Sequence, residues 1–222
     1  MLQELLTGIQ SLIFPANCAI CRRGLSSSTL IICPSCNNRL KLLMLTPFHP
    51  PVSQGALDGM YSLYRYAPPL IDLIHGFKYQ GATRLGKIFI MAMAHSIDRT
   101  QYPFNNLDAI IPIPLHLSKH RERGFNQAEL LAHGIAGFLH LPIYTNTLTR
   151  CVSLPSQTHL SQKERWTNQE GTFRITQPSL ILTKKILLVD DLTTSGATAQ
   201  TAAFELKKQG AGCVYLLTLA KA

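Results

Sequence analysis

Apolar positions along the chain follow two alternating periods, that of a strand and that of a helix. Strand-like apolar runs cover 60–66, 107–113, 143–149, 172–175, 185–189 and 213–219. Helical spacing covers 69–79, 84–99, 126–139 and 198–209. Because strands and helices alternate and most strands are apolar, the pattern predicts an α/β domain with a mainly parallel, twisted sheet flanked by helices.

Local signals refine some of these elements. The segment 60–66 alternates aromatic and polar residues, so we expect a half-exposed strand there. A basic loop is expected after the strand 107–113, and the pair Asn126 and Glu129 forms a capping box that opens the next helix.

The first quarter of the chain is organised differently. Leucines and isoleucines recur at helical spacing within 1–15, which predicts an amphipathic helix that packs on the body of the protein or contacts a membrane surface. The segment 47–55 is rich in proline and turn residues, so we expect a linker between a module of 1–50 and a domain of 51–222. Glu4 and the lack of a basic start argue against a secretory signal, and no apolar stretch is long enough to span a membrane. A cytoplasmic protein is expected, with association with the inner face of the membrane left open.

Four cysteines form two close pairs, Cys18-x2-Cys21 and Cys33-x2-Cys36, with eleven residues between the pairs. Four thiolates at this spacing can close tetrahedrally around one Zn²⁺. Disulfides and free structural cysteines are the alternatives, and a reducing cytoplasm disfavours the first of them. Because all four positions are filled by protein ligands, the expected zinc is structural rather than catalytic.

The strand 185–189 leads into two acids, Asp190 and Asp191, followed by a turn of small residues and a helix. The phosphate loop expected there consists of Thr193, Thr194, Ser195, Gly196, Ala197 and Thr198. Backbone N–H groups at such a helix N-terminus bind phosphate, and the loop lacks the Gly-Lys-Ser/Thr ending of nucleoside triphosphatases. An acid pair beside an anion site suits a phosphorylated sugar, whose vicinal hydroxyls donate to a carboxylate. Adjacent strand residues point to opposite faces, so we expect one aspartate to face the ribose and the other to organise the loop.

The string ILLVDDLTTSGAT (186–198) resembles the phosphoribosyl-pyrophosphate (PRPP) motif of type I phosphoribosyltransferases. The segments 111–132 and 165–173, together with the four-cysteine module, resemble the ComF family, which is named for competence for DNA uptake. This resemblance covers nearly the whole chain. It implies a type I phosphoribosyltransferase-like fold with a small N-terminal zinc module.

The resemblance also implies roles for individual residues. PRPP would bind with Mg²⁺, and Asp190, Asp191 and Arg165 would form the catalytic set, with Arg165 on a mobile lid over 150–170. Cations would neutralise the diphosphate, and the candidates are Lys78, Lys119, Arg121 and Arg123.

Charge leaves the partner open. The chain has 21 Lys and Arg against 12 Asp and Glu, a net charge of +9, which suits nucleic acid and polyphosphorylated metabolites alike. One hypothesis is a PRPP-binding protein of the competence type that handles single-stranded DNA in natural transformation. The alternative is an active phosphoribosyltransferase of nucleotide metabolism or salvage without a nucleic-acid role. A competence helicase or another protein that docks on the zinc module is a further expected partner. No residue specifies which acceptor would receive the phosphoribosyl group, or whether the transfer takes place.

Overall fold

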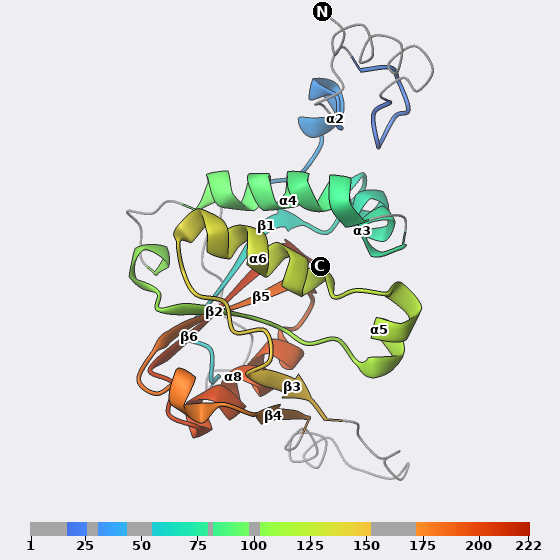
Figure 1. Cartoon of the computed structure of the whole chain (residues 1–222). Helices are drawn as coiled ribbons and strands as arrows, with labels where there is room; N and C mark the ends of the chain where they lie inside the picture. The colour runs from blue at the N-terminus through green and yellow to red at the C-terminus, as the bar shows by residue number, and fades with distance from the viewer. Residues whose placement is uncertain (1–16, 26–30, 44–54, 80–81, 98–102, 152–171) are drawn as a thin grey trace, which may run out of the picture.

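A four-stranded parallel sheet forms the centre of the molecule (Figure 1). The computed structural model describes residues 17–25, 31–43, 55–79, 82–97, 103–151 and 172–222. The strands are β1 (Gly59–Arg65), β2 (Ala109–Pro112), β5 (Lys185–Thr193) and β6 (Cys213–Lys221). Their order is β1-β6-β5-β2, and all three neighbouring pairs run parallel. The short strands β3 (Leu148–Arg150) and β4 (Phe173–Ile175) form a separate antiparallel pair.

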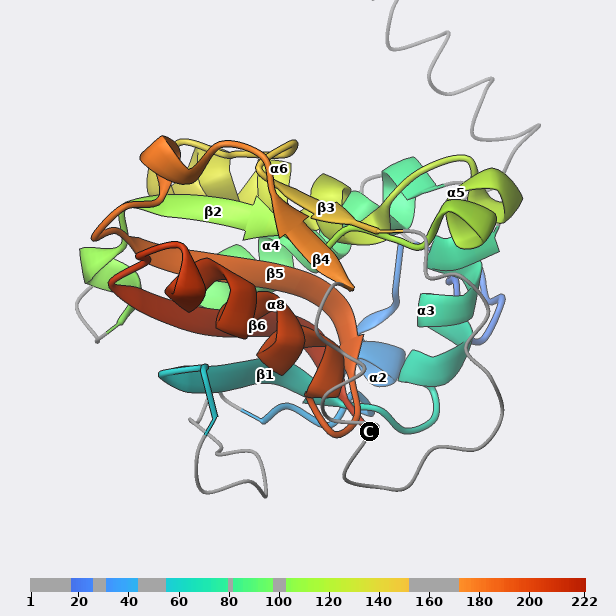
Figure 2. The same ribbon diagram turned by 90° about the horizontal axis from the view of Figure 1, so that it is seen from below.

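Helices cover both faces of the sheet. Figures 1 and 2 show α4 (Ala82–Ser96) and α6 (Gln127–Leu139) on one face and α8 (Ala197–Lys208) on the other. The helix α3 (Leu70–Tyr79) follows β1 and packs against α4. The shorter elements within the described ranges are α2 (Pro34–Asn37), α5 (Leu117–Arg123) and two single 3₁₀ turns, Phe104–Asn106 and Pro178–Leu180. The predicted fold class, a mainly parallel sheet flanked by helices with a four-cysteine cluster near the N-terminus, is confirmed.

Two apolar clusters hold the layers together, one on each face of the sheet. Within β5, Leu187 and Val189 join the cluster under α4 and α6, whereas Ile186 and Leu188 join the cluster under α8. A strand covered on both faces has to be apolar at every position, which is why these runs read as continuous rather than alternating.

The prediction that β1 is half-exposed is wrong. Every residue of β1 except Arg65 is buried. The polar Ser62 tolerates burial because its hydroxyl shares a 2.5 Å hydrogen bond with the hydroxyl of Thr218 on β6. The polar position within this alternating segment is therefore a buried, hydrogen-bonded hydroxyl and does not face solvent.

The basic loop expected after β2 is also corrected, because it contains the helix α5. His116 caps this helix by accepting a 3.3 Å hydrogen bond from the backbone N–H of Ser118, and Gly124 ends it at φ 77°. No residue of α5 is buried, so it has no apolar period that could reveal it. The cap predicted for α6 is confirmed at Asn126, whose side chain accepts from the backbone N–H of Ala128 at 3.1 Å.

The four-cysteine module packs on the body of the protein. Cys18 and Cys36 belong to the same apolar cluster as Leu63 of β1. The backbone N–H of Arg65 donates to Lys41 O at 2.8 Å, which ties the module to β1. The expected N-terminal helix, and all of the expected linker except Gly55, lie outside the described residues, so the domain boundary stays a prediction. Within the described part of the chain, no helix has the length and apolarity needed to cross a membrane.

Candidate functional site

The strand β5, the turn after it and the helix α8 build a small hollow at the carboxyl end of the sheet. Its volume is about 130 Å³, and Asp190, Thr194, Ser195 and Thr198 are among the residues that line it. The strand extends to Thr193, four residues beyond its predicted end. Both acids therefore lie on the strand itself, and the turn is confined to 194–196.

The N-terminus of α8 is open to an anion. Its N-cap is Gly196, at φ 78° and ψ 2°, and no side chain caps the helix. A Cβ built on Gly196 would lie 2.5 Å from Met60 Cε, the flexible end of a side chain that can shift, so it is the backbone conformation that favours glycine here. The side chains of Thr194, Ser195 and Thr198 are exposed, and that of Thr193 is buried. The backbone N–H of Ala197 donates to Ser195 Oγ at 3.4 Å. N–H groups and hydroxyls at a positive helix end are the features that bind phosphate.

The two aspartates have different surroundings. Asp190 lines the hollow, and its Oδ1 accepts a 2.8 Å hydrogen bond from the backbone N–H of Asp191. Asp191 is buried, and its Oδ2 lies 2.9 Å from Nζ of Lys78, which α3 brings to the end of β5. Burial, and then repulsion from the Asp191 carboxylate, raise the pKa of Asp190 well above its ordinary value. The acid pair therefore holds one carboxyl group next to the expected phosphate loop and one in an ion pair.

The predicted diphosphate cations occupy three different situations. Lys78 is partly buried in its ion pair with Asp191, whereas Lys119 and Arg121 are exposed on α5. Arg123 turns toward α3: its Cζ lies 5.5 Å from the centroid of the Tyr79 ring, and its Nη1 donates to Gln127 Oε1 at 3.1 Å. Sequence reasoning missed both the pairing of Lys78 and this contact. Arg165 and nearly all of the expected lid lie outside the described residues.

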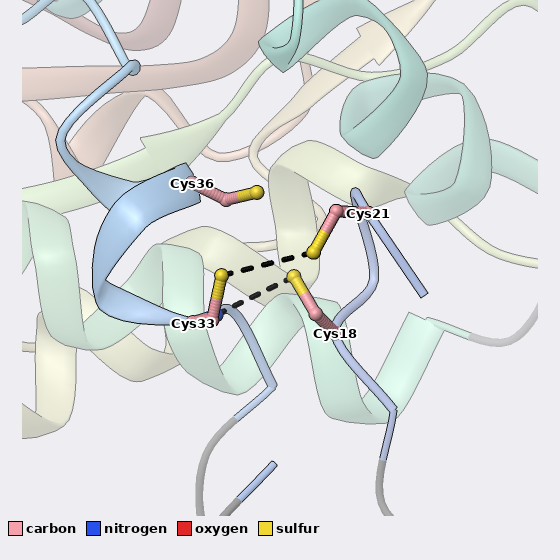
Figure 3. Close-up of side chains that lie close together, drawn as sticks. All are labelled: Cys18, Cys21, Cys33 and Cys36. Atoms are coloured by element: carbon pink, nitrogen blue, oxygen red, sulfur yellow. Dashed lines mark hydrogen bonds between the residues drawn. The ribbon is translucent and has the colours of Figure 1, made fainter. Parts of the chain in front are cut away.

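The four cysteines converge in space (Figure 3). Their sulfur atoms all lie within 4.8 Å of one another, with Cys21 Sγ and Cys33 Sγ 3.8 Å apart. Tetrahedral zinc with bonds of about 2.3 Å separates its sulfurs by about 3.8 Å, so the cluster can hold a metal ion of this kind. None of the chain's six cysteines forms a disulfide.

The cluster combines thiols of very different acidity. Burial opposes ionisation of Cys18, but hydrogen bonds, including a 3.4 Å one from the backbone N–H of Cys33, lower its pKa to about 6. Burial raises the pKa of Cys36 to about 12, and the neighbouring cysteines add to the rise. A cation that replaces the thiol protons would relieve the repulsion between the sulfurs.

Curated relatives cover most of the chain. DNA utilization protein YhgH of Escherichia coli (strain K12) is 28% identical over 215 residues, which are 92% of this chain and 89% of the relative. Competence protein F of Haemophilus influenzae is 29% identical over 170 residues, with 74% and 73% of the two chains covered. Competence protein ComFC of Bacillus subtilis is 27% identical over 207 residues, with 87% and 78% covered. No family model matches the chain.

Two of the solved structures that match part of the chain carry PRPP or phosphoribosyltransferase in their names. Glutamine PRPP amidotransferase from B. subtilis matches with a TM-score of 0.41 and 16% identity, over 60% of this chain and 25% of that one. Purine phosphoribosyltransferase from Pyrococcus horikoshii matches with a TM-score of 0.36 and 18% identity, over 61% of this chain and 71% of that one.

Proposed function

We propose that this chain, which belongs to the ComF family, is a phosphoribosyltransferase-like protein that binds PRPP and handles single-stranded DNA in competence. The names of its relatives, DNA utilization protein and competence protein, support the second half of the proposal. The first half rests on one observation: an uncapped helix N-terminus and a carboxyl group share the hollow at the end of β5.

In this proposal the 5-phosphate of PRPP lies at the N-terminus of α8. The N–H groups of 196–198 and the hydroxyls of Thr194, Ser195 and Thr198 donate to its oxygens. Asp190 lines the same hollow, so its carboxylate accepts hydrogen bonds from the ribose hydroxyls. Asp191 does not reach the ribose directly; it holds Lys78 at the site.

The diphosphate carries most of the charge of PRPP. Lys78, Lys119 and Arg121 supply positive charge from α3 and α5, and Arg165 adds to it from the lid. Arg123 acts differently, because its guanidinium is held against Tyr79 and Gln127. Mg²⁺ bound with PRPP would neutralise diphosphate oxygens, and Asp190 and Asp191 would offer it hard oxygen ligands.

Zinc is the metal proposed for Cys18, Cys21, Cys33 and Cys36. Four thiolates suit a soft tetrahedral ion, and they leave no coordination position for substrate. The role of the metal is therefore to fix the two cysteine turns against the body of the protein.

Titration calorimetry of PRPP with Mg²⁺ tests the PRPP site. We expect measurable binding by the native chain and its loss when Asp190 and Asp191 are both replaced by alanine. The control is Glu129→Gln, which removes a carboxylate from the surface of α6 and should bind PRPP as the native chain does. Unchanged binding by the double variant would remove the proposed site.

The alternative function, an active phosphoribosyltransferase of nucleotide salvage, uses the same hollow. A screen for pyrophosphate release from PRPP, across free bases and single-stranded DNA, separates the two. Release with a free base, together with no affinity for single-stranded DNA, would favour the alternative. Affinity for DNA that falls steeply with salt would favour the competence function.

A further inference from the structure

A second hollow lies where the first cysteine turn meets α3 and α4. Its volume is about 410 Å³, within the range of roughly 300–1,000 Å³ that is usual for small-molecule sites. Ile20, Leu73 and Leu85 contribute apolar surface, and Arg22, Asp72 and His75 contribute polar groups. Among the residues that the structure describes, none lines both this hollow and the one at α8.

We propose that this second hollow binds a nucleobase. A base needs an apolar wall, a flat ring to stack on, and donors and acceptors for its edge. The hollow offers all three, with Arg22 as a pure donor and Asp72 as an acceptor.

The stacking partner is His75, which is exposed and already held in place. Its ring centroid lies 4.9 Å from that of Tyr79, at an interplanar angle of 39°. On Tyr79 in turn lies the guanidinium of Arg123, 5.5 Å from the ring centroid. Arg123 on α5 therefore contacts Tyr79, and Tyr79 contacts His75 at the hollow. These contacts restrict the imidazole of His75 in advance, so it loses little conformational freedom when a base stacks on it.

The backbone at Arg22 supports a role for its side chain. Arg22 has φ 63°, a left-handed conformation that costs a residue with a Cβ about 1 kcal/mol or more. Its backbone N–H donates to Cys18 O at 2.9 Å, so the turn around the cysteines imposes the conformation. Glycine would fit this position without strain. An arginine at a strained position that also lines a hollow points to a function for the guanidinium.

Charge at the rim predicts which bases fit. Asp72 accepts from the exocyclic amino group of cytosine or guanine, while Arg22 donates to a carbonyl oxygen of the same base. Thymine has no amino group. Its one ring N–H lies between two carbonyl oxygens, so a carboxylate of Asp72 that accepts from this N–H also faces a carbonyl oxygen on either side. Cytosine and guanine are therefore preferred over thymine, and one such pair of contacts is worth about tenfold in affinity or more.

The test uses the full zinc-containing chain and fluorescence titration with oligo-dC, oligo-dT and an abasic strand of equal length. We expect oligo-dC to bind about tenfold tighter than oligo-dT, and Asp72→Asn to reduce this preference. Arg22→Gly should weaken oligo-dC binding about tenfold while leaving the melting temperature unchanged or higher. Arg39→Ala is the control, because it removes one exposed arginine of the same module outside the hollow. His75→Phe should retain binding that His75→Ala loses.

A parallel titration with dCMP identifies the source of the base. Affinity for dCMP close to that for oligo-dC indicates a free nucleotide, whereas binding of the oligonucleotide alone indicates a strand. Equal binding of the dC, dT and abasic strands would overturn the proposal, as would equal losses for Arg22→Gly and Arg39→Ala. The inference does not rest on PRPP binding: the double alanine variant of Asp190 and Asp191 should still bind oligo-dC.

Discussion

At the scale of single residues, the two neighbouring aspartates differ in their electrostatic surroundings. Asp191 lies 2.9 Å from Lys78 Nζ, so its charge is compensated. At Asp190 the positive charge of Lys78 only partly offsets burial and the repulsion from Asp191, which together raise the pKa of Asp190. Ionising Asp190 in the folded protein therefore costs free energy, as is common for a carboxyl group that binds a ligand.

Replacing Asp190 by asparagine should stabilise the free protein by about 1 kcal/mol at neutral pH. Asparagine keeps the Oδ1 acceptor for the backbone N–H of Asp191 and removes the buried charge. A raised pKa means that the folded state favours the protonated acid, so the native chain loses stability as the pH rises from the ordinary aspartate pKa through the raised one. The gain from Asp190→Asn should thus be full above that window and disappear below it, as measured by urea unfolding across pH.

The matched variant Asp191→Asn should act in the opposite direction. It leaves Lys78 without its partner in a partly buried position and should cost about 1–3 kcal/mol at neutral pH. Equal effects of the two asparagine variants would contradict the different surroundings assigned to the two acids.

At the scale of secondary-structure elements, a helix could be predicted where its burial requires apolar residues at helical spacing. The helices α3, α6 and α8 have apolar faces in the core, and their predicted bounds lie close to the observed ones. The helix α5 buries nothing, so only its cap at His116 and its stop at Gly124 could have identified it. The pairing of Lys78 with Asp191 joins residues more than a hundred positions apart, and a single sequence has no local signal for it. The turn before α8 and the start of that helix could be predicted because their signal, a run of small residues after a buried strand, is local.

The start of α8 provides a test at this scale. Gly196→Ala places a Cβ 2.5 Å from Met60 Cε at φ 78°, and should destabilise the protein by about 1–2 kcal/mol and weaken PRPP binding. Gly137→Ala is the control: it lies on the exposed side of α6 with nothing within 4 Å of the added Cβ, so it should stabilise by about 0.5–1 kcal/mol. Urea unfolding of both variants measures the difference. A Gly196→Ala variant as stable as the native chain would show that the turn does not depend on glycine.

At the scale of the whole molecule, the four-cysteine module and the sheet behave as one packed body. Cys18 and Cys36 share an apolar cluster with β1 and α3, and the backbone of 41–43 is hydrogen-bonded to β1. The second hollow, which we propose binds a nucleobase, is formed by the first cysteine turn together with α3 and α4. A metal that orders the cysteine turns would therefore stabilise the body and shape the hollow at the same time.

Metal removal should reveal this coupling. The purified protein should contain about one zinc per chain, and a chelator should lower the melting temperature and abolish the preference for oligo-dC while PRPP binding at α8 persists. Cys36 has a pKa of about 12 without metal, so zinc must displace its proton, and zinc affinity should rise with pH. Calorimetry in buffers of different ionisation enthalpy measures the released protons. Cys36→Ser should reproduce the effect of the chelator, whereas Cys151→Ser, at a cysteine outside the cluster, should not. A chelated protein with unchanged melting and unchanged base preference would show that the module and the body are energetically independent.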